Sequence, residues 1–372
     1  MFNPTALYIV MAAFAATVVV TWALRHFSSL LEIGYDKDEG VQKFHTQTTS
    51  RLGGLGLLVG LCLGIGLSVH QLPEVASIGG WLLIACIPVF AGGLIEDLTH
   101  RVSPGLRLTL ATCSALFVLY VLKIGVSRTD IAWIDYLLQF PVFYYVTTLL
   151  VVSGFINATN IIDGFHGLAS GTIAIMILAM GILAATAQDW TMVNLCALTL
   201  AVTLGFFVWN WPFGKIFLGD AGAYLLGFWT VQLGLLIVHR NTNISPMAPV
   251  LIGLYPLVET LFSMYRRKFI RSHPMGHPDS LHLHTLVYRR LILNPATDTT
   301  DIKRNSANSK VAPSLWTLTL INGFAAVVFS KDTVDLVLFG ILSATFYLYL
   351  YKSLVRFNFS ISIFRPRRVA DL

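Results

Sequence analysis

The stretch Asn157-Ala-Thr-Asn160-Ile-Ile-Asp163-Gly164-Phe-His166-Gly167-Leu-Ala-Ser-Gly171 lies between two long apolar runs, at about residues 141–158 and 168–187. Its amide, carboxylate and backbone groups cannot face lipid, because each unpaired polar group in hydrocarbon costs several kcal/mol. The stretch therefore predicts an aqueous, functional surface at a membrane edge. If it is helical, Asn157, Asn160 and Asp163 share one sector, since they recur at a spacing of three.

The composition of the whole chain is that of a membrane protein. Its 372 residues are 55% hydrophobic and only 12% charged, which is far too apolar for a soluble globular protein. The largest polar block runs only from Arg266 to about Val311, so we expect one integral-membrane domain over residues 1–372. The first apolar run, Thr5 to Leu24, lacks the basic flank and short core of a cleavable signal, and we expect it to be retained.

Apolar runs of membrane-spanning length predict an all-α polytopic membrane protein, a bundle of about 11 transmembrane helices. Ten is the alternative count, because the run at 80–95 is short. The runs lie at about 5–24, 52–70, 80–95, 105–124, 141–158, 168–187, 191–212, 221–239, 247–265, 312–329 and 333–351.

The basic residues predict the orientation of this bundle. On alternate sides of the spans, 21 of the 25 Lys and Arg residues fall on one side. Because Lys and Arg are enriched in cytoplasmic loops, the N-terminus is expected outside and the C-terminus in the cytoplasm, in the inner (cytoplasmic) membrane. The cytoplasmic loops would be about 25–51, 96–107, 157–167, 213–222 and 266–311. A net charge of +6 alone would suit nucleic acid, but no basic strip interleaved with aromatics supports such a partner.

Two carboxylate-bearing motifs fall in these loops. Glu96 and Asp97 are adjacent at a membrane edge, and since like charges repel, the pair suggests a bound cation or a general base. A solvated helix end is the alternative. The oxygens of Asn157, Asn160 and Asp163 suit Mg²⁺ or Mn²⁺, or hydrogen bonds to a base or ribose. Their alternative is a helix cap followed by a turn.

Three further motifs point to phosphate. In Phe217-Leu-Gly219-Asp220-Ala-Gly222, Asp220 could cap a helix or hold a metal, with the glycines admitting phosphate oxygens. Arg266 belongs to a basic run that could instead be a headgroup anchor. The alternating His282 and His284 lack a third zinc ligand nearby and fit better as donors to phosphate oxygens. Lys43 and His45 repeat that theme before the second span.

Taken together, these residues resemble the polyprenyl-phosphate N-acetylhexosamine-1-phosphate transferase family (glycosyltransferase family 4), whose members start cell-wall and O-antigen-type glycans on a lipid carrier. The resemblance covers about residues 36–290 in matching order. It rests on an acidic pair, an Asn-x-x-Asn-x-x-Asp-Gly block, a Phe-x-Gly-Asp-x-Gly element and a Pro-Asp-x-x-His-x-His stretch. Glu96 stands where the family usually has Asp, and Thr285 where a third His is usual. The family's fold, a bundle of ten or eleven transmembrane helices, agrees with the span count.

The resemblance implies an enzyme that transfers N-acetylhexosamine 1-phosphate from a UDP-sugar to undecaprenyl phosphate, giving the lipid-linked sugar and UMP. It implies Mg²⁺, with Mn²⁺ as the alternative, at Asp220 with Asn157 as co-ligand. The family includes dimers, so a homodimer stays open, as does the identity of the sugar. The resemblance further implies that Asp97, with Glu96, acts on the lipid phosphate, and that Asn160 and Asp163 surround the nucleotide or sugar. It also implies that His282, His284 and Arg266 bind the donor phosphates, and that Lys43 and His45 guide the acceptor headgroup.

Two rival functions remain. A transporter or flippase of an anionic lipid or small ion would use a similar bundle, but transporters usually place ionisable groups near the bilayer midplane. A catalytically inactive homologue that serves as an assembly partner would keep the same fold. The first rival predicts substrate movement without UMP release, and the second predicts that the acidic positions tolerate substitution.

Overall fold

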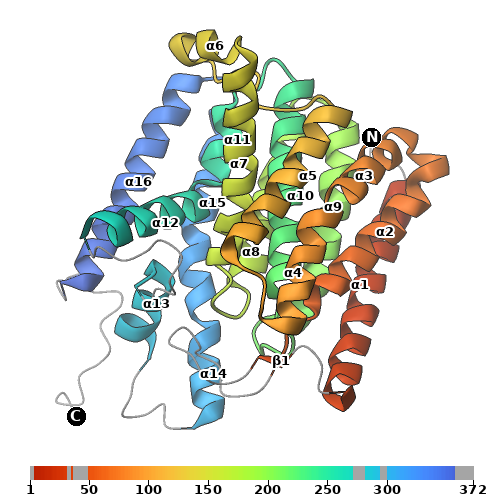
Figure 1. The fold of residues 1–372 in the computed structure, drawn as a ribbon, viewed down its shortest axis with the longest axis vertical. Coiled ribbons are helices and arrows are strands. Elements are labelled where there is room, and N and C mark those ends of the chain that lie inside the picture. Colours follow the sequence, from red (N-terminus) through yellow and green to blue (C-terminus); the bar gives the residue numbers. More distant parts are fainter. Residues whose placement is uncertain (1–3, 32–34, 37–48, 271–280, 294–299, 357–372) are drawn as a thin grey trace.

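The computed structural model describes residues 4–31, 35–36, 49–270, 281–293 and 300–356, and this part of the chain is almost entirely helical (Figure 1). The long helices are α1 (Pro4–Leu31), α2 (Gly53–Gln71), α3 (Pro73–Ala85), α4 (Ile87–Thr99), α5 (Pro104–Val121), α7 (Pro141–Ile161), α8 (Leu168–Thr186), α9 (Trp190–Asn210), α10 (Gly219–Arg240), α15 (Val311–Val328) and α16 (Thr333–Val355). The shorter helices are α6 (Ala132–Leu138), α11 (Met247–Ile252), α12 (Leu254–Tyr265), α13 (Leu283–Val287) and α14 (Asp301–Ser309), with π-helical turns η1 (Arg266–Ile270) and η2 (Tyr288–Ile292). Strands β1 (Tyr35–Asp36) and β2 (Thr49–Ser50) pair antiparallel.

The expected all-α polytopic membrane fold is confirmed. Within the described residues, nine helices are long and apolar enough to cross a membrane, and the count is ten if the bent pair α3 and α4 forms one span. The two helices of that pair meet at an angle of 49°. The bend has a covalent cause, because Pro88 has no N–H to donate to the carbonyl one turn earlier.

The ninth expected span, at 247–265, is divided in the structure. It forms the separate helices α11 and α12, which meet at Gly253. Pro256 cannot donate a hydrogen bond to Ile252, so the helix breaks between them. Figure 1 shows α12 lying across the direction of α7 and α10. The prediction that this apolar run is helical is confirmed, but the run forms two helices and not one continuous span.

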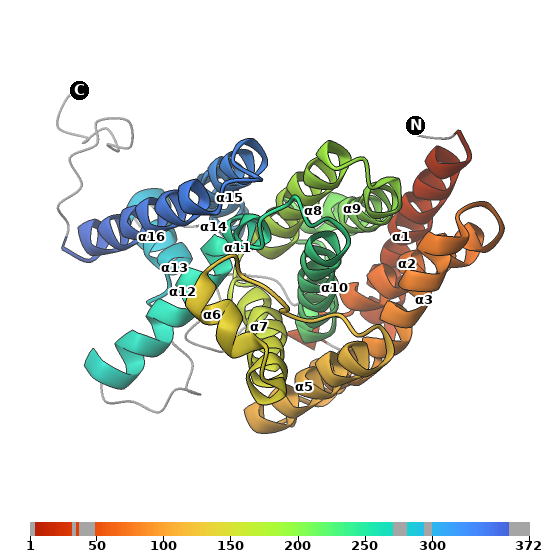
Figure 2. The same ribbon diagram turned by 90° about the horizontal axis from the view of Figure 1, so that it is seen from above.

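Helix α10 is the centre of the bundle. Inside the protein, 89% of its span is buried, compared with 11% for α16 at the edge. Figure 2 shows the other helices ranged around α10, and it packs against α2, α4, α7 and α8. Gly222 and Gly227 have no side chain, which lets neighbouring backbones come close. The acidic residue at its start, Asp220, is therefore held at the end of the most enclosed helix.

The polar motifs lie at one end of this bundle. Helices α13 and α14 and strand β1 occupy the end opposite α6, as Figure 1 shows. The start of α10, the ends of α4 and α7, and the starts of α2 and α5 come together there, as the contacts below establish. Successive membrane spans run in opposite directions. Segments far apart in the sequence can therefore meet at one end of the bundle only if the spans between them return the chain to that end.

Candidate active site

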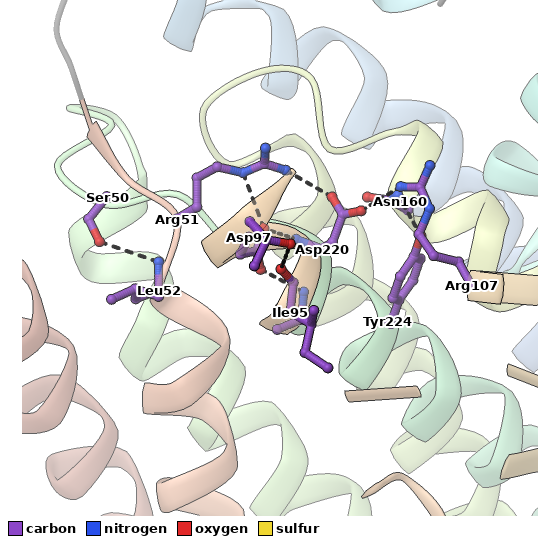
Figure 3. A network of polar contacts seen from close by, with 11 residues as sticks. Ser50, Arg51, Leu52, Ile95, Asp97, Arg107, Asn160, Asp220 and Tyr224 are labelled. Carbon is purple, nitrogen blue, oxygen red and sulfur yellow. Dashed lines mark hydrogen bonds and ion pairs between the residues drawn. The ribbon is translucent and has the colours of Figure 1, made fainter. Parts of the chain in front are cut away.

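The carboxylate of Asp220 is bracketed by two arginines (Figure 3). Arg51 Nη2 lies 2.8 Å from Asp220 Oδ1, and Arg107 Nη1 lies 2.7 Å from Asp220 Oδ2. The Asp220 side chain is only 7% exposed, while each arginine is 22% exposed. Two guanidinium groups thus meet at one carboxylate, and their planar sets of N–H donors suit an anionic ligand.

The second acid, Asp97, is committed to the backbone of α10. Its Oδ1 accepts the N–H of Asp220 at 2.8 Å, and its Oδ2 accepts the N–H of Ala221 at 2.9 Å. Arg51 Nε also lies 3.2 Å from Asp97 Oδ1. These N–H groups belong to the first turn of α10, where N–H groups have no hydrogen-bond acceptor within the helix itself. Asp97 therefore caps α10 from another helix and sets the position of Asp220.

Backbone hydrogen bonds lock the start of α2 to the segment before α10. Phe217 N–H donates to the Ser50 carbonyl at 2.8 Å, and Gly53 N–H donates to the Phe217 carbonyl at 3.1 Å. Gly219 adopts φ +72°, and a Cβ there would collide with the carbonyl oxygen of Arg51. Glycine is required here for both reasons. The motif glycines thus hold Arg51 and Asp220 in register.

The two asparagines at the end of α7 lie at different depths. Asn160 Nδ2 donates to the Tyr224 hydroxyl at 3.2 Å, one turn along α10 from Asp220. Asn157 lies one turn deeper in the bundle, and its Nδ2 donates to the Ser153 carbonyl at 2.8 Å. Asn160 is therefore brought beside the Asp220 cluster, whereas no contact in the described residues joins Asn157 to Asp220.

Asp163, just beyond α7, belongs to the same electrostatic cluster. Burial raises the pKa of its carboxyl to about 7. The nearby Arg51 opposes this rise, and the negative charges of Asp220 and Asp97 add to it. Three segments far apart in the sequence thus place their acids within reach of one another.

Two asparagines that the sequence analysis did not single out hold the loop that follows Asp163. The N–H of Gly167 donates to Asn210 Oδ1 at 2.8 Å, and the N–H of His166 donates to Asn308 Oδ1 at 2.9 Å. The indole N–H of Trp316 donates to the Gly167 carbonyl at 3.2 Å. Asn210 ends an apolar run, where nothing in the sequence separates it from an ordinary helix end.

Glu96 faces away from its neighbour Asp97. Its Oε2 accepts the N–H of Val102 at 2.8 Å, in the turn between α4 and α5. That turn leads directly to Arg107. Glu96 therefore shapes the turn that delivers this arginine. Arg107 itself was not singled out, because a single basic residue at the edge of a span looks like a membrane anchor.

The two predicted histidines lie together against the loop of Asp163. The rings of His282 and His284 stack with centroids 5.1 Å apart and planes 8° apart. The ring of His284 contacts that of Phe165 at 5.6 Å, and a Cβ on Gly164 would lie 3.2 Å from His284 Nε2. Burial lowers the pKa of His284 to about 3, so its ring is neutral at pH 7.

The remaining basic residues are placed differently. Arg266 is buried, its Nη1 donates to the Tyr351 hydroxyl at 2.8 Å, and its guanidinium lies over the rings of Tyr351 and Phe262. It thus packs between α12 and α16. Lys43 and His45 lie outside the described residues.

The donor set at Asp220 can be tested for a metal. Among the described residues, no three His, Cys, Asp or Glu side chains form a metal-holding group. Mg²⁺, however, is commonly held by one or two carboxylates while waters and substrate phosphates complete its shell. Each oxygen of Asp220 receives one arginine N–H and has a second lone pair for an ion, so Asp220 fits as such a single anchor. Asp97 fits less well, because its Oδ1 already meets both the N–H of Asp220 and Arg51 Nε, and its Oδ2 accepts the N–H of Ala221.

Comparison with known proteins shows which family the chain is similar to. The family model "Glycosyl transferase family 4" matches residues 80–238, which contain Asp97, the Asn157–Gly171 stretch and Asp220. A probable undecaprenyl-phosphate N-acetylglucosaminyl 1-phosphate transferase of Bacillus subtilis (strain 168) is 25% identical over 265 residues, 68% of this chain and 70% of the relative. The undecaprenyl-phosphate alpha-N-acetylglucosaminyl 1-phosphate transferase of Salmonella typhi is 28% identical over 290 residues, 77% of each chain. Its counterpart in Escherichia coli (strain K12) is 27% identical over 263 residues, 69% of this chain and 70% of the relative. Over these residues the chain is similar to glycosyl transferase family 4, and over about two thirds or more of its length it is similar to these transferases.

Proposed function

We propose that this protein transfers an N-acetylhexosamine 1-phosphate from a UDP-sugar to undecaprenyl phosphate, which starts a lipid-linked surface glycan such as O-antigen. The observation that carries the proposal is the enclosed Asp220 carboxylate between Arg51 and Arg107. It lies at the end of a membrane bundle where a lipid phosphate and a soluble diphosphate could meet. The relatives are undecaprenyl-phosphate N-acetylglucosaminyl 1-phosphate transferases, which suggests the acceptor and the transferred group.

The reaction needs no chemistry at the sugar carbon. An oxygen of the lipid phosphate attacks the β-phosphorus of the donor, and a new P–O–P bridge forms. The bond from the β-phosphorus to the bridging oxygen breaks, and that oxygen leaves with UMP. Such transfers depend on positioning and charge neutralisation rather than on covalent participation by the protein.

The arginines supply the positive charge. Arg51 and Arg107 each carry a planar set of N–H donors that matches phosphate oxygens. Asp220 keeps both guanidinium groups aimed at one point, and Asp97 fixes Asp220 through the backbone of α10. Asp97 therefore acts by orienting this group, since its two oxygens are already occupied.

Magnesium, or manganese in its place, is part of the proposal. Asp220 would hold the ion, with Asn157 as the expected co-ligand. The bound ion would neutralise charge on the donor diphosphate. Asn160 and Asp163 would surround the nucleotide or sugar. His282, His284 and Arg266 would face the donor phosphates, and Lys43 with His45 the acceptor headgroup.

The end of the bundle that carries these residues would face the cytoplasm, with the protein in the inner membrane. Two observations favour a transferase over a transporter. The charged residues of the site lie at one end of the bundle. The span of α10 that leads away from them is enclosed and apolar. A transport pathway would need ionisable groups near the midplane.

The test is an assay of the purified protein with undecaprenyl phosphate, Mg²⁺ and a panel of UDP-sugars. We expect stoichiometric release of UMP and formation of a lipid-linked sugar phosphate with one or more donors. The matched control omits the lipid phosphate. Movement of substrate across vesicles without UMP would instead support a transporter and remove the proposal.

A further inference from the structure

Glu259, on α12, is a buried carboxylate that the proposed reaction has not used. Its side chain is 1% exposed. One oxygen, Oε1, lies 2.9 Å from His282 Nδ1 and accepts the backbone N–H of Leu283 at 3.1 Å. A single carboxylate oxygen thus holds both the ring of the first motif histidine and the first residue of α13.

Keeping a carboxylate in this place is costly. Burial of a charge is strongly unfavourable unless hydrogen bonds and opposite charge compensate it. The charge of Glu259 also reaches the hydroxyls of Tyr255 and Tyr347. The Tyr255 hydroxyl has no hydrogen-bond partner within the described residues. An apolar side chain at this position would pack α12 without the cost of burying a charge. The carboxylate therefore indicates that Glu259 has a role beyond packing, namely its contact with His282.

The direction of the hydrogen bond defines the state of His282. An ionised carboxylate only accepts hydrogen bonds, so His282 Nδ1 must carry the proton that it shares with Glu259. The ring is then fixed in orientation, and Nε2 is the nitrogen left to meet a ligand. At many metal sites, a carboxylate that accepts the second ring N–H of a histidine fixes its tautomer and orientation in the same way.

The held ring is also coupled to the loop of Asp163. His282 stacks on His284, and His284 lies against Gly164 and Phe165. A change in the angle of the first ring would therefore be transmitted to the second ring and to the loop. The sequence of contacts runs from α12 through two imidazoles to the segment that follows α7.

We propose that Glu259 is a positioning residue, which holds His282 so that the histidine pair presents a fixed face to the donor phosphates. The proposal rests on the proposed function and adds a residue from a helix outside the four family motifs. It makes Glu259 act through His282, not by contact with substrate. The dependence of one residue on the other is measurable.

The experiment is a double-mutant cycle with Glu259→Gln and His282→Asn. Gln keeps the size of the side chain but loses the charge. Asn keeps an N–H near the place of Nδ1 but removes Nε2. We expect Glu259→Gln to lower kcat/KM for the UDP-sugar by about 10- to 100-fold, the usual effect of removing a carboxylate behind a functional histidine. The KM for undecaprenyl phosphate should change less than about twofold. In the His282→Asn background, the same substitution should change kcat/KM less than about twofold.

The matched control is Thr260→Val, which removes a buried hydroxyl from the next residue of α12. That hydroxyl has no partner within the described residues, and activity should stay within about twofold of the wild type. Melting temperatures in detergent are measured for all variants. If Glu259→Gln does not fold, Glu259→Asp replaces it in the same cycle, judged by the same criteria.

Two outcomes would overturn the positioning role in an active enzyme. One is a loss of less than about twofold in Glu259→Gln. The other is an equal loss with and without His282, which is what a purely structural role would produce. A wild-type protein that releases no UMP would instead refute the proposed function itself, so the two failures are distinguishable.

Discussion

The two ends of α10 carry ionic clusters built from the same residue types but arranged in opposite ways. At the start of the helix, Asp220 is held by Arg51 and Arg107. At its end, Arg240 is shared by Glu74 at 2.7 Å and Asp189 at 2.7 Å. In the first cluster one acid lies between two arginines, and in the second one arginine lies between two acids. Asp97 and Asp163 also belong to the first cluster, so two guanidinium groups held at one point, not net charge, distinguish it as a site for a phosphate.

Burial separates the two clusters further. Asp97 and Asp220 are 0% and 7% exposed, whereas Glu74 is 56% exposed. Asp189 also caps α9, accepting the N–H of Met192 at 3.2 Å. Asp189 is 7% exposed, like Asp220, but Arg240 is 28% exposed, so the Arg240 cluster is a partly exposed clip that joins the starts of α3 and α9 to the end of α10. The comparison shows that an ion pair alone does not indicate a site: two guanidinium groups held together, enclosure and neighbouring polar loops do.

The largest effect is expected from Asp220→Asn. This change keeps the shape of the side chain but removes the charge that aligns both arginines and would anchor the metal. We expect a loss of about 100- to 1,000-fold in transferase turnover, typical of removing a central electrostatic group. Formation of labelled lipid-linked sugar is measured in membranes with matched protein levels. Activity within about tenfold of the wild type would remove the distinction between the two ends.

A matched pair of arginine variants tests the same distinction more finely. Arg107→Lys keeps the charge but loses the planar set of donors, and we expect a loss of about 10- to 100-fold in kcat/KM. Arg240→Lys makes the same change at the partly exposed clip and should alter kcat/KM less than about twofold. Equal losses in the two variants would show that the starting end of α10 has no special role.

A pair of glycine variants tests the backbone lock at the start of α10. Gly219→Ala forces a side chain into a left-handed conformation and against the Arg51 carbonyl. We expect it to destabilise the protein by at least about 1–2 kcal/mol, seen as a lower melting temperature in detergent. Gly66→Ala, in α2, meets no atom within 4 Å and should be neutral or slightly stabilising. A Gly219→Ala protein as stable as Gly66→Ala would contradict the lock.

The smallest effects concern pH, and the two ends should respond with opposite signs. Burial raises the pKa of Asp163 to about 7, whereas the same carboxyl ionises near pH 4 in the unfolded chain. Between these pH values ionisation favours the unfolded chain, so the wild-type protein becomes less stable as the pH rises. Asp163→Asn should therefore gain stability relative to the wild type as the pH rises from about 4 to 7.

Asp189 behaves in the reverse way. Burial raises its pKa, but hydrogen bonds from Arg240 and Met192 outweigh this and hold the pKa below its usual range. Asp189→Asn should be less stable than the wild type at neutral pH, and the difference should shrink as the pH falls below about 4. Metal-free melting curves across pH 3–8 measure both trends. The same sign for both variants would show that the acids at the two ends lie in similar environments.

Much of the fold followed from patterns along the chain. Apolar runs located the long helices, and the two expected spans that divide do so beside Pro88 and Pro256, where the prolines are visible in the sequence. Glu259 was also visible as a lone carboxylate within the run at 247–265. An ionisable residue inside an apolar segment indicates function by default, but its partner could not be read from the sequence. His282 lies 23 positions away along the chain.

The sequence by itself determined that the chain is a helical membrane protein and which polar motifs could meet at one edge of it. Hydropathy and motif spacing are properties of neighbouring residues, so they can be read without a fold. Only the tertiary structure decided that Arg107, 113 positions from Asp220, shares that acid with Arg51, and that Asp97 is committed to the backbone of α10. Charge pairing falls off steeply with distance and depends on burial, and both are set by how the helices pack.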